Sequence, residues 1–557
     1  MNSPIASTAT LALLAAPALA QDWTNLGGNA QRNGRIQASG PTSSTIAWTA
    51  TPSSIIAWAP FIEGDRVVTV RESGFPQNGG AANDTIRCYS LASGAQQWSI
   101  TLPFNGNTAQ QWIAWIAGVN GGRIYASRSQ NGSPQPVTAL DITNGAILWS
   151  STATTTAFAY DGAVFAPDGD PIVGDFNSLT RINSTDGATV WSVPRTCPVS
   201  GNCGPAMSST GVFLDQAAPG GQVLTKLDPA TGATLYSSTL MPGFTDQNSP
   251  FCNPSGSLVF FSRTQNNTSV DYLFCFADTG TALVELWRQP VRWTMSHEHG
   301  LASDDSIYTF LQNNEFVRLD ALTGTVSATA GVLAPIGTSN LSPKTAVDAF
   351  GRVYVSNGWA SSPATDGRMW AFSGDLSSNL FTLSLSRPNQ GGPAIGHDGT
   401  LVMCDLTAVR GYRAPLASYC TAGTTTNGCT ANLSGTGTPD ANAGSGFVLN
   451  VADVEGAKTG LIFYGLSGAQ AQSWGTSTSF LCVKPPTQRT NAQATGGTAN
   501  ACDGAMTLDW NAFIQTPGVL GWPFAGGEVV CAQAWFRDPP SPKTTMLSDA
   551  LQFTVAP

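Results

Sequence analysis

One hairpin-like pattern returns at a nearly constant interval through most of this 557-residue chain. Its clearest copy runs from Leu140-Asp141 through Gly145 to Trp149. The turn glycines lie 51, 42, 45, 48 and 44 residues apart, at Gly94, Gly145, Gly187, Gly232, Gly280 and Gly324. A period in the forties is typical of a four-stranded propeller blade. The pattern therefore predicts an array of blades before about residue 415.

The residues within one copy predict a hairpin between two outer strands. Asp accepts backbone hydrogen bonds at the start of the turn, and Gly takes the position with positive φ. Apolar and polar residues alternate into the turn (Val137, Ala139) and out of it (Ile147, Trp149), as in half-buried strands. The Trp or Tyr four residues after the glycine carries a large apolar area, which we expect to lie between neighbouring blades.

The pattern L-D-x-x-T-G-x-x-x-W resembles the repeat of the PQQ-like (pyrroloquinoline-quinone-like) β-propellers, over roughly residues 23–414. That superfamily includes quinone-dependent alcohol and sugar dehydrogenases. It also includes scaffold proteins that bind no cofactor, such as the outer-membrane assembly lipoprotein BamB. The resemblance therefore implies a fold and leaves the function open between these classes.

The expected fold is all-β, an eight-bladed β-propeller followed by a small β-sandwich domain. The turn positions place the blades at about 58–102, 112–153, 157–193, 205–240, 249–290, 299–332, 344–385, and 393–414 together with 46–50. Seven blades are the alternative, because the copy near Phe372 has lost the usual spacing. The lone strand Ile46–Thr49 is expected to complete the last blade by pairing with residues 393–413.

Composition divides the chain into five segments. They are a signal peptide at 1–20, an N-terminal wrapping segment at 21–45, the propeller at 46–415, a junction at 416–446 and a β-sandwich-like domain at 447–557. An apolar core at 11–16 and the small-x-small site Ala18-Leu19-Ala20 indicate the signal, although residues 1–10 hold no Lys or Arg. The junction is rich in Thr, Gly and Asn. The last segment resembles a C-terminal module of other exported bacterial proteins.

Charge and cysteine content limit which classes of partner and which cellular compartment fit this sequence. A net charge of −10, a pI near 4.7 and 11% charged residues disfavour nucleic-acid binding. No stretch after the signal reaches membrane-spanning length. Eleven cysteines in an exported chain predict disulfides. The candidate pairs are Cys197–Cys203, Cys420–Cys429 and Cys482–Cys502, with Cys252–Cys275 as a weaker fourth.

The resemblance also implies where a functional site would lie, namely on the propeller axis. There, loops run from the outer strand of each blade to the inner strand of the next. Trp112, Trp115 and Asn389 are candidate ligand-binding residues, because aromatic rings stack on sugars or quinones and amides form hydrogen bonds. Aromatic residues also plug propeller channels, so both interpretations of the tryptophans stay open.

His297 and His299 are candidate metal ligands. In extended backbone, residues at i and i+2 share a face, so the two imidazoles can bind one ion together with Asp246 or Glu298. The alternative is a hydrogen-bonded loop without metal.

Two markers of quinone catalysis are missing from the sequence: adjacent cysteines and a C-x-x-C-H haem site. The leading prediction is therefore an exported, non-catalytic scaffold without a cofactor. It would bind protein or glycan partners at the loop mouth and be periplasmic, cell-surface or secreted. The alternative is a PQQ-dependent oxidoreductase acting on alcohols or sugars. It would use PQQ and Ca²⁺, with Asp246, Glu298 and Lys344 as candidate catalytic residues. A metal-dependent lyase or hydrolase at His297 and His299 is a third hypothesis.

Overall fold

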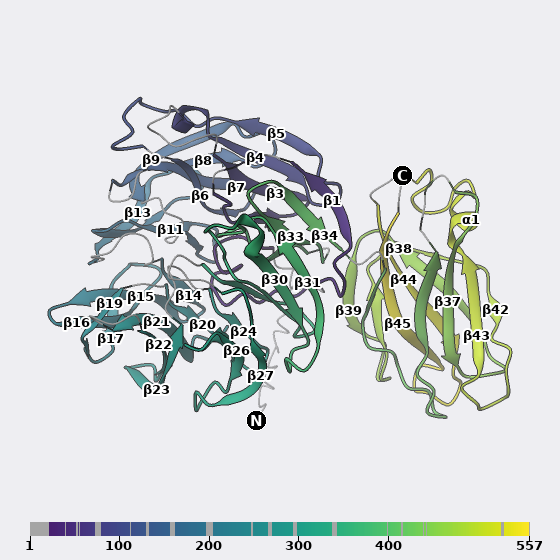
Figure 1. Cartoon of the computed structure of the whole chain (residues 1–557). Helices are drawn as coiled ribbons and strands as arrows, with labels where there is room; N and C mark the ends of the chain where they lie inside the picture. Colours follow the sequence, from purple (N-terminus) through teal and green to yellow (C-terminus); the bar gives the residue numbers. More distant parts are fainter. Residues whose placement is uncertain are drawn as a thin grey trace, which may run out of the picture.

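The computed structural model describes residues 22–555 apart from 39, 52–53, 55, 73–79, 112, 130–132, 156–161, 197–203, 247–248, 266–269, 293–297, 337–341, 398, 414–415, 438, 440, 442 and 525–527. The predicted signal peptide lies outside these residues. The chain is nearly all β, with a ring of sheets up to residue 412 and a separate C-terminal domain (Figure 1). No described helix is both long and apolar enough to cross a membrane.

In the described part of the chain, eight antiparallel sheets follow one another around the ring, as in a β-propeller. In chain order, the first four are β2 (Phe61–Glu63), β3 (Arg66–Arg71), β4 (Thr85–Ser90) and β5 (Gln96–Ile100); β6 (Ile113–Asn120), β7 (Arg123–Ser129), β8 (Gln135–Asp141) and β9 (Ile147–Thr155); β10 (Val164–Phe165), β11 (Pro171–Gly174), β12 (Ser178–Ile182) and β13 (Thr189–Pro194); and β14 (Ala206–Ser208), β15 (Gly211–Ala218), β16 (Gly221–Leu227) and β17 (Thr234–Ser237), with β18 (Met241–Pro242) beside β16.

The remaining four sheets complete the ring. They are β19 (Phe244–Asp246) and β20 (Phe251–Cys252) on the inner edge of β21 (Leu258–Gln265), followed by β22 (Val270–Asp278) and β23 (Leu283–Arg292); β24 (Gly300–Leu301), β25 (Ile307–Phe310), β26 (Glu315–Leu319) and β27 (Val326–Val332); β28 (Lys344–Val347), β29 (Val353–Ser356), β30 (Gly367–Phe372) and β31 (Asn379–Leu385); and β32 (Ala394–Ile395), β33 (Leu401–Cys404) and β34 (Val409–Tyr412) with β1 (Ile46–Ala50). Two short 3₁₀ helices, η2 (Gly80–Asn83) and η3 (Ala364–Asp366), lie in connections.

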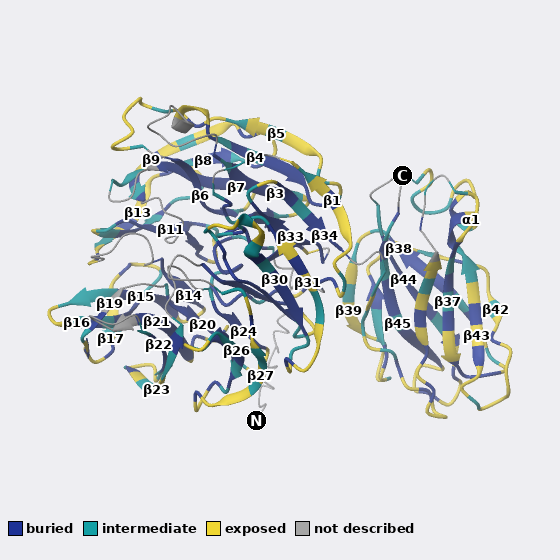
Figure 2. Cartoon of the chain, in the orientation of Figure 1, coloured by how far each residue is buried: buried dark blue, intermediate teal, exposed yellow. Residues whose placement is uncertain are grey.

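Strand β1 closes the ring as the sequence predicted. It pairs antiparallel with β34, with Trp48 opposite Gly411 and Thr49 opposite Arg410. The last blade is thus built from both ends of the propeller chain. Figure 2 shows the mostly buried inner strands and the exposed residues on outer strands such as β5 and β27.

The repeated tryptophans lie between blades, which confirms the role predicted for them. Each indole Nε1 donates a hydrogen bond to a backbone carbonyl in the turn of the next blade. The distances are 2.7 Å from Trp48 to Leu91, 3.0 Å from Trp98 to Ile142, 3.1 Å from Trp149 to Ser184, 3.0 Å from Trp191 to Pro229 and 2.9 Å from Trp287 to Ala321. The Trp48 contact joins the last blade to the first. Ring closure therefore uses the same contact as four of the other blade interfaces.

The C-terminal domain has two main sheets that face each other across one core. The larger contains β35 (Leu416–Tyr419), β45 (Thr545–Thr554), β44 (Val529–Arg537), β38 (Thr459–Gly465), β41 (Thr487–Arg489) and β42 (Gln493–Ala494). The smaller contains β36 (Asn432–Gly437), β37 (Phe447–Val454) and β43 (Gly504–Asp509); a hairpin of β39 (Ala469–Ser473) and β40 (Phe480–Val483) and the helix α1 (Trp510–Ile514) complete the domain. The rings of Phe447 and Phe553, one from each sheet, are 4.9 Å apart.

Residues 416–446 were expected to be a junction, and the structure corrects this. Within this segment β35 pairs with β45, and β36 pairs with β37. Leu433 on β36 is buried in the core of the domain. A composition rich in Thr and Gly fits exposed strand faces as well as loops, so it did not distinguish the two.

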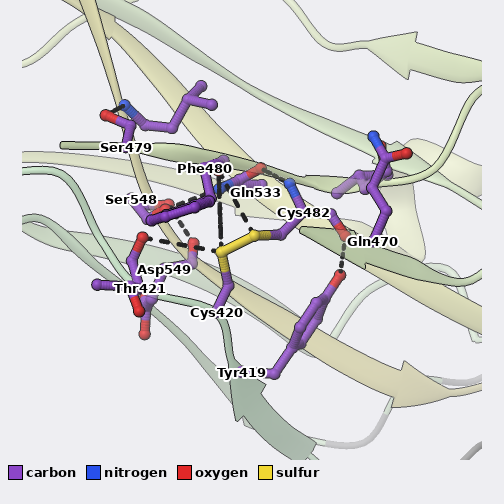
Figure 3. The surroundings of a disulfide bond; sticks show 12 residues. Tyr419, Cys420, Thr421, Gln470, Ser479, Phe480, Cys482, Gln533, Ser548 and Asp549 are labelled. Carbon is purple, nitrogen blue, oxygen red and sulfur yellow. Dashed lines mark hydrogen bonds between the residues drawn. A yellow bond between two sulfur atoms is a disulfide. The ribbon is translucent and has the colours of Figure 1, made fainter. Parts of the chain in front are cut away.

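Four of the candidate cysteines form disulfides, but with other partners than expected. The bonds are Cys420–Cys482 and Cys429–Cys502, whose Cα atoms are 6.2 and 5.2 Å apart. Figure 3 shows why Cys420 reaches Cys482. Gln533 on β44 accepts a hydrogen bond from Cys482 N (3.0 Å) and donates to Phe480 O (2.8 Å), which holds β40 against the large sheet beside Cys420. Tertiary packing, rather than closeness in sequence, sets the pairing.

The pair Cys252–Cys275 is also corrected, because both residues are buried free thiols. Cys252 on β20 and Cys275 on β22 lie on opposite sides of β21. Strands two apart in a sheet are roughly 9.5 Å apart. A disulfide needs Cα atoms within about 7 Å. Cys197 and Cys203 lie outside the described residues.

Candidate functional site

The N-terminal segment occupies the centre of the ring, where the sequence suggested only a wrapping segment. We call residues 22–38 the axial segment. Its carbonyls accept hydrogen bonds from inner-strand amides of six blades: Trp23 from Ile62 (2.8 Å), Thr24 from Val119 (2.7 Å), Ala30 from Met207 (2.8 Å), Gln31 from Cys252 (3.0 Å), Asn33 from Leu301 (2.8 Å) and Gly34 from Val347 (2.7 Å). Sequence order along the segment follows blade order around the axis, so the segment encircles it.

Side chains of the axial segment extend these contacts to the other two blades. Asn25 Nδ2 donates to Ala163 O (3.0 Å), just before β10. Asp22 Oδ1 lies 3.4 Å from His397 Nδ1 in the last blade. Asp22 Oδ2 accepts a hydrogen bond from Gly64 N (2.9 Å) in the first blade. Every blade therefore contacts the segment.

Arg32 is the most deeply placed charge of the axial segment. Its guanidinium donates to Pro205 O (2.7 Å) and Gly162 O (2.9 Å), which belong to different blades. The side chain is almost fully buried, as is Asn33, whose Nδ2 donates to Cys252 O (3.1 Å). A buried guanidinium is stable only with such partners. The polar residues of the segment are thus matched to backbone carbonyls lining the channel.

Two of the three candidate catalytic residues meet beside the axial segment. Lys344 Nζ lies 2.6 Å from Glu298 Oε1, and Glu298 Oε2 accepts a hydrogen bond from Gly27 N (3.2 Å). Lys344 is only 2% exposed, and burial lowers the pKa of its amine. Glu298 therefore links the charge of Lys344 to the backbone of the axial segment.

The third candidate, Asp246, ends strand β19 opposite Arg263 on β21. Its side chain lies outside the described part of the structure. Arg263 forms a fully buried ion pair with Asp215, a pair that the sequence did not single out.

His299 is a buried, hydrogen-bonded side chain. Its Nδ1 lies 3.1 Å from Thr309 Oγ1 and its Nε2 lies 3.4 Å from Ser262 Oγ. The ring stacks on Phe251 at 5.2 Å, and burial lowers the pKa of His299 to about 3. His297 is not among the described residues, which contain no cluster of three or more His, Cys, Asp or Glu able to hold a metal ion.

Trp115 faces the interior rather than the mouth. It lies on β6, is 1% exposed, and lines an apolar cavity of about 10 Å³ together with Leu26 of the axial segment. This cavity is too small for even one ring of a ligand. Trp112 lies outside the described residues. Asn389 is half-buried between β31 and β32, where its backbone N donates to Trp359 O (3.2 Å).

Arg32, Asn33 and Asn25 were not predicted from the sequence to be axial residues. The signal present was a run of Asn and Gly interrupted by Trp23, Leu26 and Ile36, all of which are buried. Gly34 shows why glycine is needed: a Cβ there would lie 2.5 Å from Thr345 O.

The described axial residues do not fit a bound quinone. Trp115 has no exposed face, Lys344 is paired with Glu298, and the axial segment fills the ring at the level of the inner strands. Planar stacking and free hydrogen-bonding groups are what a cofactor pocket supplies.

Comparisons with solved structures found several similar chains. Among solved structures, BamB from Moraxella catarrhalis is 14% identical, with 66% of this chain and 85% of that chain covered and a TM-score of 0.35. Quinohemoprotein alcohol dehydrogenase from Comamonas testosteroni is 10% identical, with 72% and 83% covered and a TM-score of 0.49. The Dos1 propeller is 12% identical, with 65% and 96% covered and a TM-score of 0.44.

These low structural similarities carry no argument about activity. No curated protein matches the chain. Residues 82–330 match the protein family described as outer membrane protein assembly factor BamB. This match lies within the propeller and covers less than half of the chain.

Proposed function

We propose that this protein is an exported, non-catalytic propeller scaffold that binds a protein partner, or a glycan, at the loop mouth. The observation that carries the proposal is the axial segment. It fills the ring at the level of the inner strands and engages Glu298, while Glu298 in turn neutralises Lys344. The charged groups nearest the axis thus serve the structure and are not presented to a substrate.

Export is supported by the cysteines of the C-terminal domain. Cys420–Cys482 and Cys429–Cys502 are disulfides, which form and persist in oxidising compartments. The match to the BamB family is consistent with a role at the cell envelope. Protein binding is the favoured role because that family is described by its part in protein assembly.

The decisive experiment is titration of the purified protein with PQQ and Ca²⁺, followed by tryptophan quenching and by dye reduction with a panel of alcohols and sugars. We expect no saturable binding at PQQ concentrations up to tens of micromolar, corresponding to less than roughly 6–7 kcal/mol of binding free energy. Saturable quenching with substrate-dependent turnover would overturn the proposal in favour of the quinone-dependent oxidoreductase.

A matched variant guards against nonspecific quenching. Glu298→Gln keeps the size of the side chain and removes the charge next to Lys344. If PQQ quenches wild type and variant equally without turnover, the signal does not come from an axial site. If turnover is present in the wild type and absent from the variant, the protein is catalytic and Glu298 is required for the reaction.

A further inference from the structure

We propose that the axial segment is an internal peptide ligand and that the propeller channel is a peptide-binding site. The proposal goes beyond the scaffold function, because it assigns the channel a ligand class: a turn-rich peptide with the chemistry of residues 22–38. The site would hold such a peptide without a covalent connection to β1.

The first support is the way in which the axial segment is held. Six of its carbonyls accept hydrogen bonds from the inner strands, and these bonds are 2.7 to 3.0 Å long. Only Arg35 pairs with a neighbour as a strand residue would, through an isolated bridge to Val347. The axial segment is therefore bound by blade amides arranged around it, as a peptide is held in a groove lined by backbone groups.

The second support is side-chain recognition. Trp23 and Ile36 near the two ends are buried, at 4% and 2% exposure, and act as apolar anchors. Arg32 and Asn33 between them donate to carbonyls of three blades, at Pro205, Gly162 and Cys252. A channel with these features selects for sequence as well as for a backbone with these turns.

Two glycines of the axial segment lie so close to backbone atoms that a side chain would not fit at either position. At Gly34, φ is +70° and a Cβ would lie 2.5 Å from Thr345 O, which is backbone and cannot move aside cheaply. At Gly27, a Cβ would lie 2.7 Å from Arg32 Cα. The expected ligand is therefore an apolar-anchored peptide with an Arg at the place of Arg32 and glycines at the places of Gly27 and Gly34.

The connection between the axial segment and β1 offers a place to test this. Thr42, Ser44 and Thr45 are exposed. We would insert a protease recognition sequence between Ser43 and Ser44 of the full chain, cleave it, and separate the products by size-exclusion chromatography with mass spectrometry. We expect the fragment that ends at Ser43 to elute with the rest of the chain. Prompt release of the fragment would overturn the proposal, and because the fragment is measured directly, the result does not depend on the remainder staying soluble.

Substitutions in the axial segment, and its exchange for a free peptide, then test whether the channel recognises the sequence of the segment. Arg32→Ala and Gly34→Ala should each speed release at least tenfold, whereas Gln37→Ala, at an exposed position, should not change it. A labelled synthetic peptide of residues 22–38 in excess should replace the cleaved fragment, and a scrambled peptide of the same composition should not. Equal uptake of both peptides would overturn sequence recognition. Retention without exchange, even in urea just below the unfolding transition, would show that the axial segment is a part of the core and not a ligand.

Discussion

Two turn glycines allow the stacking between blades to be measured separately from backbone strain. Gly232 and Gly280 both lie in the outer-hairpin turns of successive repeats, with φ of +73° and +83°. A Cβ at Gly232 would lie 2.7 Å from Cε3 of Trp191, whereas a Cβ at Gly280 would meet nothing within 4 Å. Replacement by Ala therefore adds the same backbone strain at both sites and a collision at only one.

The expected magnitudes follow from these distances. A left-handed conformation costs a residue with a Cβ about 1–2 kcal/mol. Overpacking against a well-ordered neighbour adds about 1–3 kcal/mol. We expect Gly280→Ala to lower the free energy of unfolding only by the cost of the left-handed backbone conformation, about 1–2 kcal/mol. Gly232→Ala should lower it by both, because Trp191 is held by its hydrogen bond to Pro229 O (3.0 Å) and cannot withdraw freely.

Urea unfolding of the full chain, followed by tryptophan fluorescence, measures the difference. The propeller and the C-terminal domain need not unfold together, so the two variants are compared with each other in the propeller transition. With an m-value of at least about 3 kcal/mol/M, a difference of 1–3 kcal/mol separates the midpoints by up to roughly 1 M. Equal midpoints for the two alanine variants would refute the argument that the Trp–Gly contact stabilises the blade interface.

Three further predictions concern other parts of the molecule. Peptide mapping of the unreduced protein should link Cys420 to Cys482, and a link from Cys420 to Cys429 would contradict the structure. His299 should stay neutral down to about pH 3, because burial lowers its pKa, so its imidazole NMR signals should not shift between pH 7 and pH 4. Burial raises the pKa of Glu72 from 4.5 to about 8, so its contribution to stability is complete below pH 4.5 and is lost as pH rises through about 8. In that window, Glu72→Gln should flatten the decline in the free energy of unfolding, which is at most about 1.4 kcal/mol per pH unit, and an unchanged pH profile would refute the assignment.

The repeat was readable from sequence because its information is local. Asp, Gly and Trp occur within one hairpin. Their spacing predicts where the turn lies and which side chain contacts the next blade. Ring closure by Ile46–Ala50 was readable for a related reason, since a lone strand before the first complete repeat needs partners after the last one.

The site was less readable because its contacts are made to backbone groups of distant segments. Arg32 binds the carbonyls of Pro205 and Gly162, and any residue would supply those carbonyls, so the sequence carries no mark of the pairing. His299 shows the same limit. Its metal-ligand pattern was a fair hypothesis, but its surroundings come from Thr309 and Ser262 on other strands. The packing of the strands determines that Cys420 pairs with Cys482, and the spacing of the cysteines in the sequence does not encode that packing.

The interface between the fourth and fifth blades shows that the glycine and the aromatic residue of the repeat obey separate constraints. Here Tyr236 replaces tryptophan, and its hydroxyl donates to Asp278 (2.6 Å), which also pairs with Lys226 (2.5 Å). This buried polar network takes the place of the indole contact, and no side chain covers Gly280. Gly280 is nevertheless retained, because its φ of +83° is required by the turn itself. A positive φ thus calls for glycine in these two turns, whereas the stacking contact can be exchanged for hydrogen bonds and an ion pair.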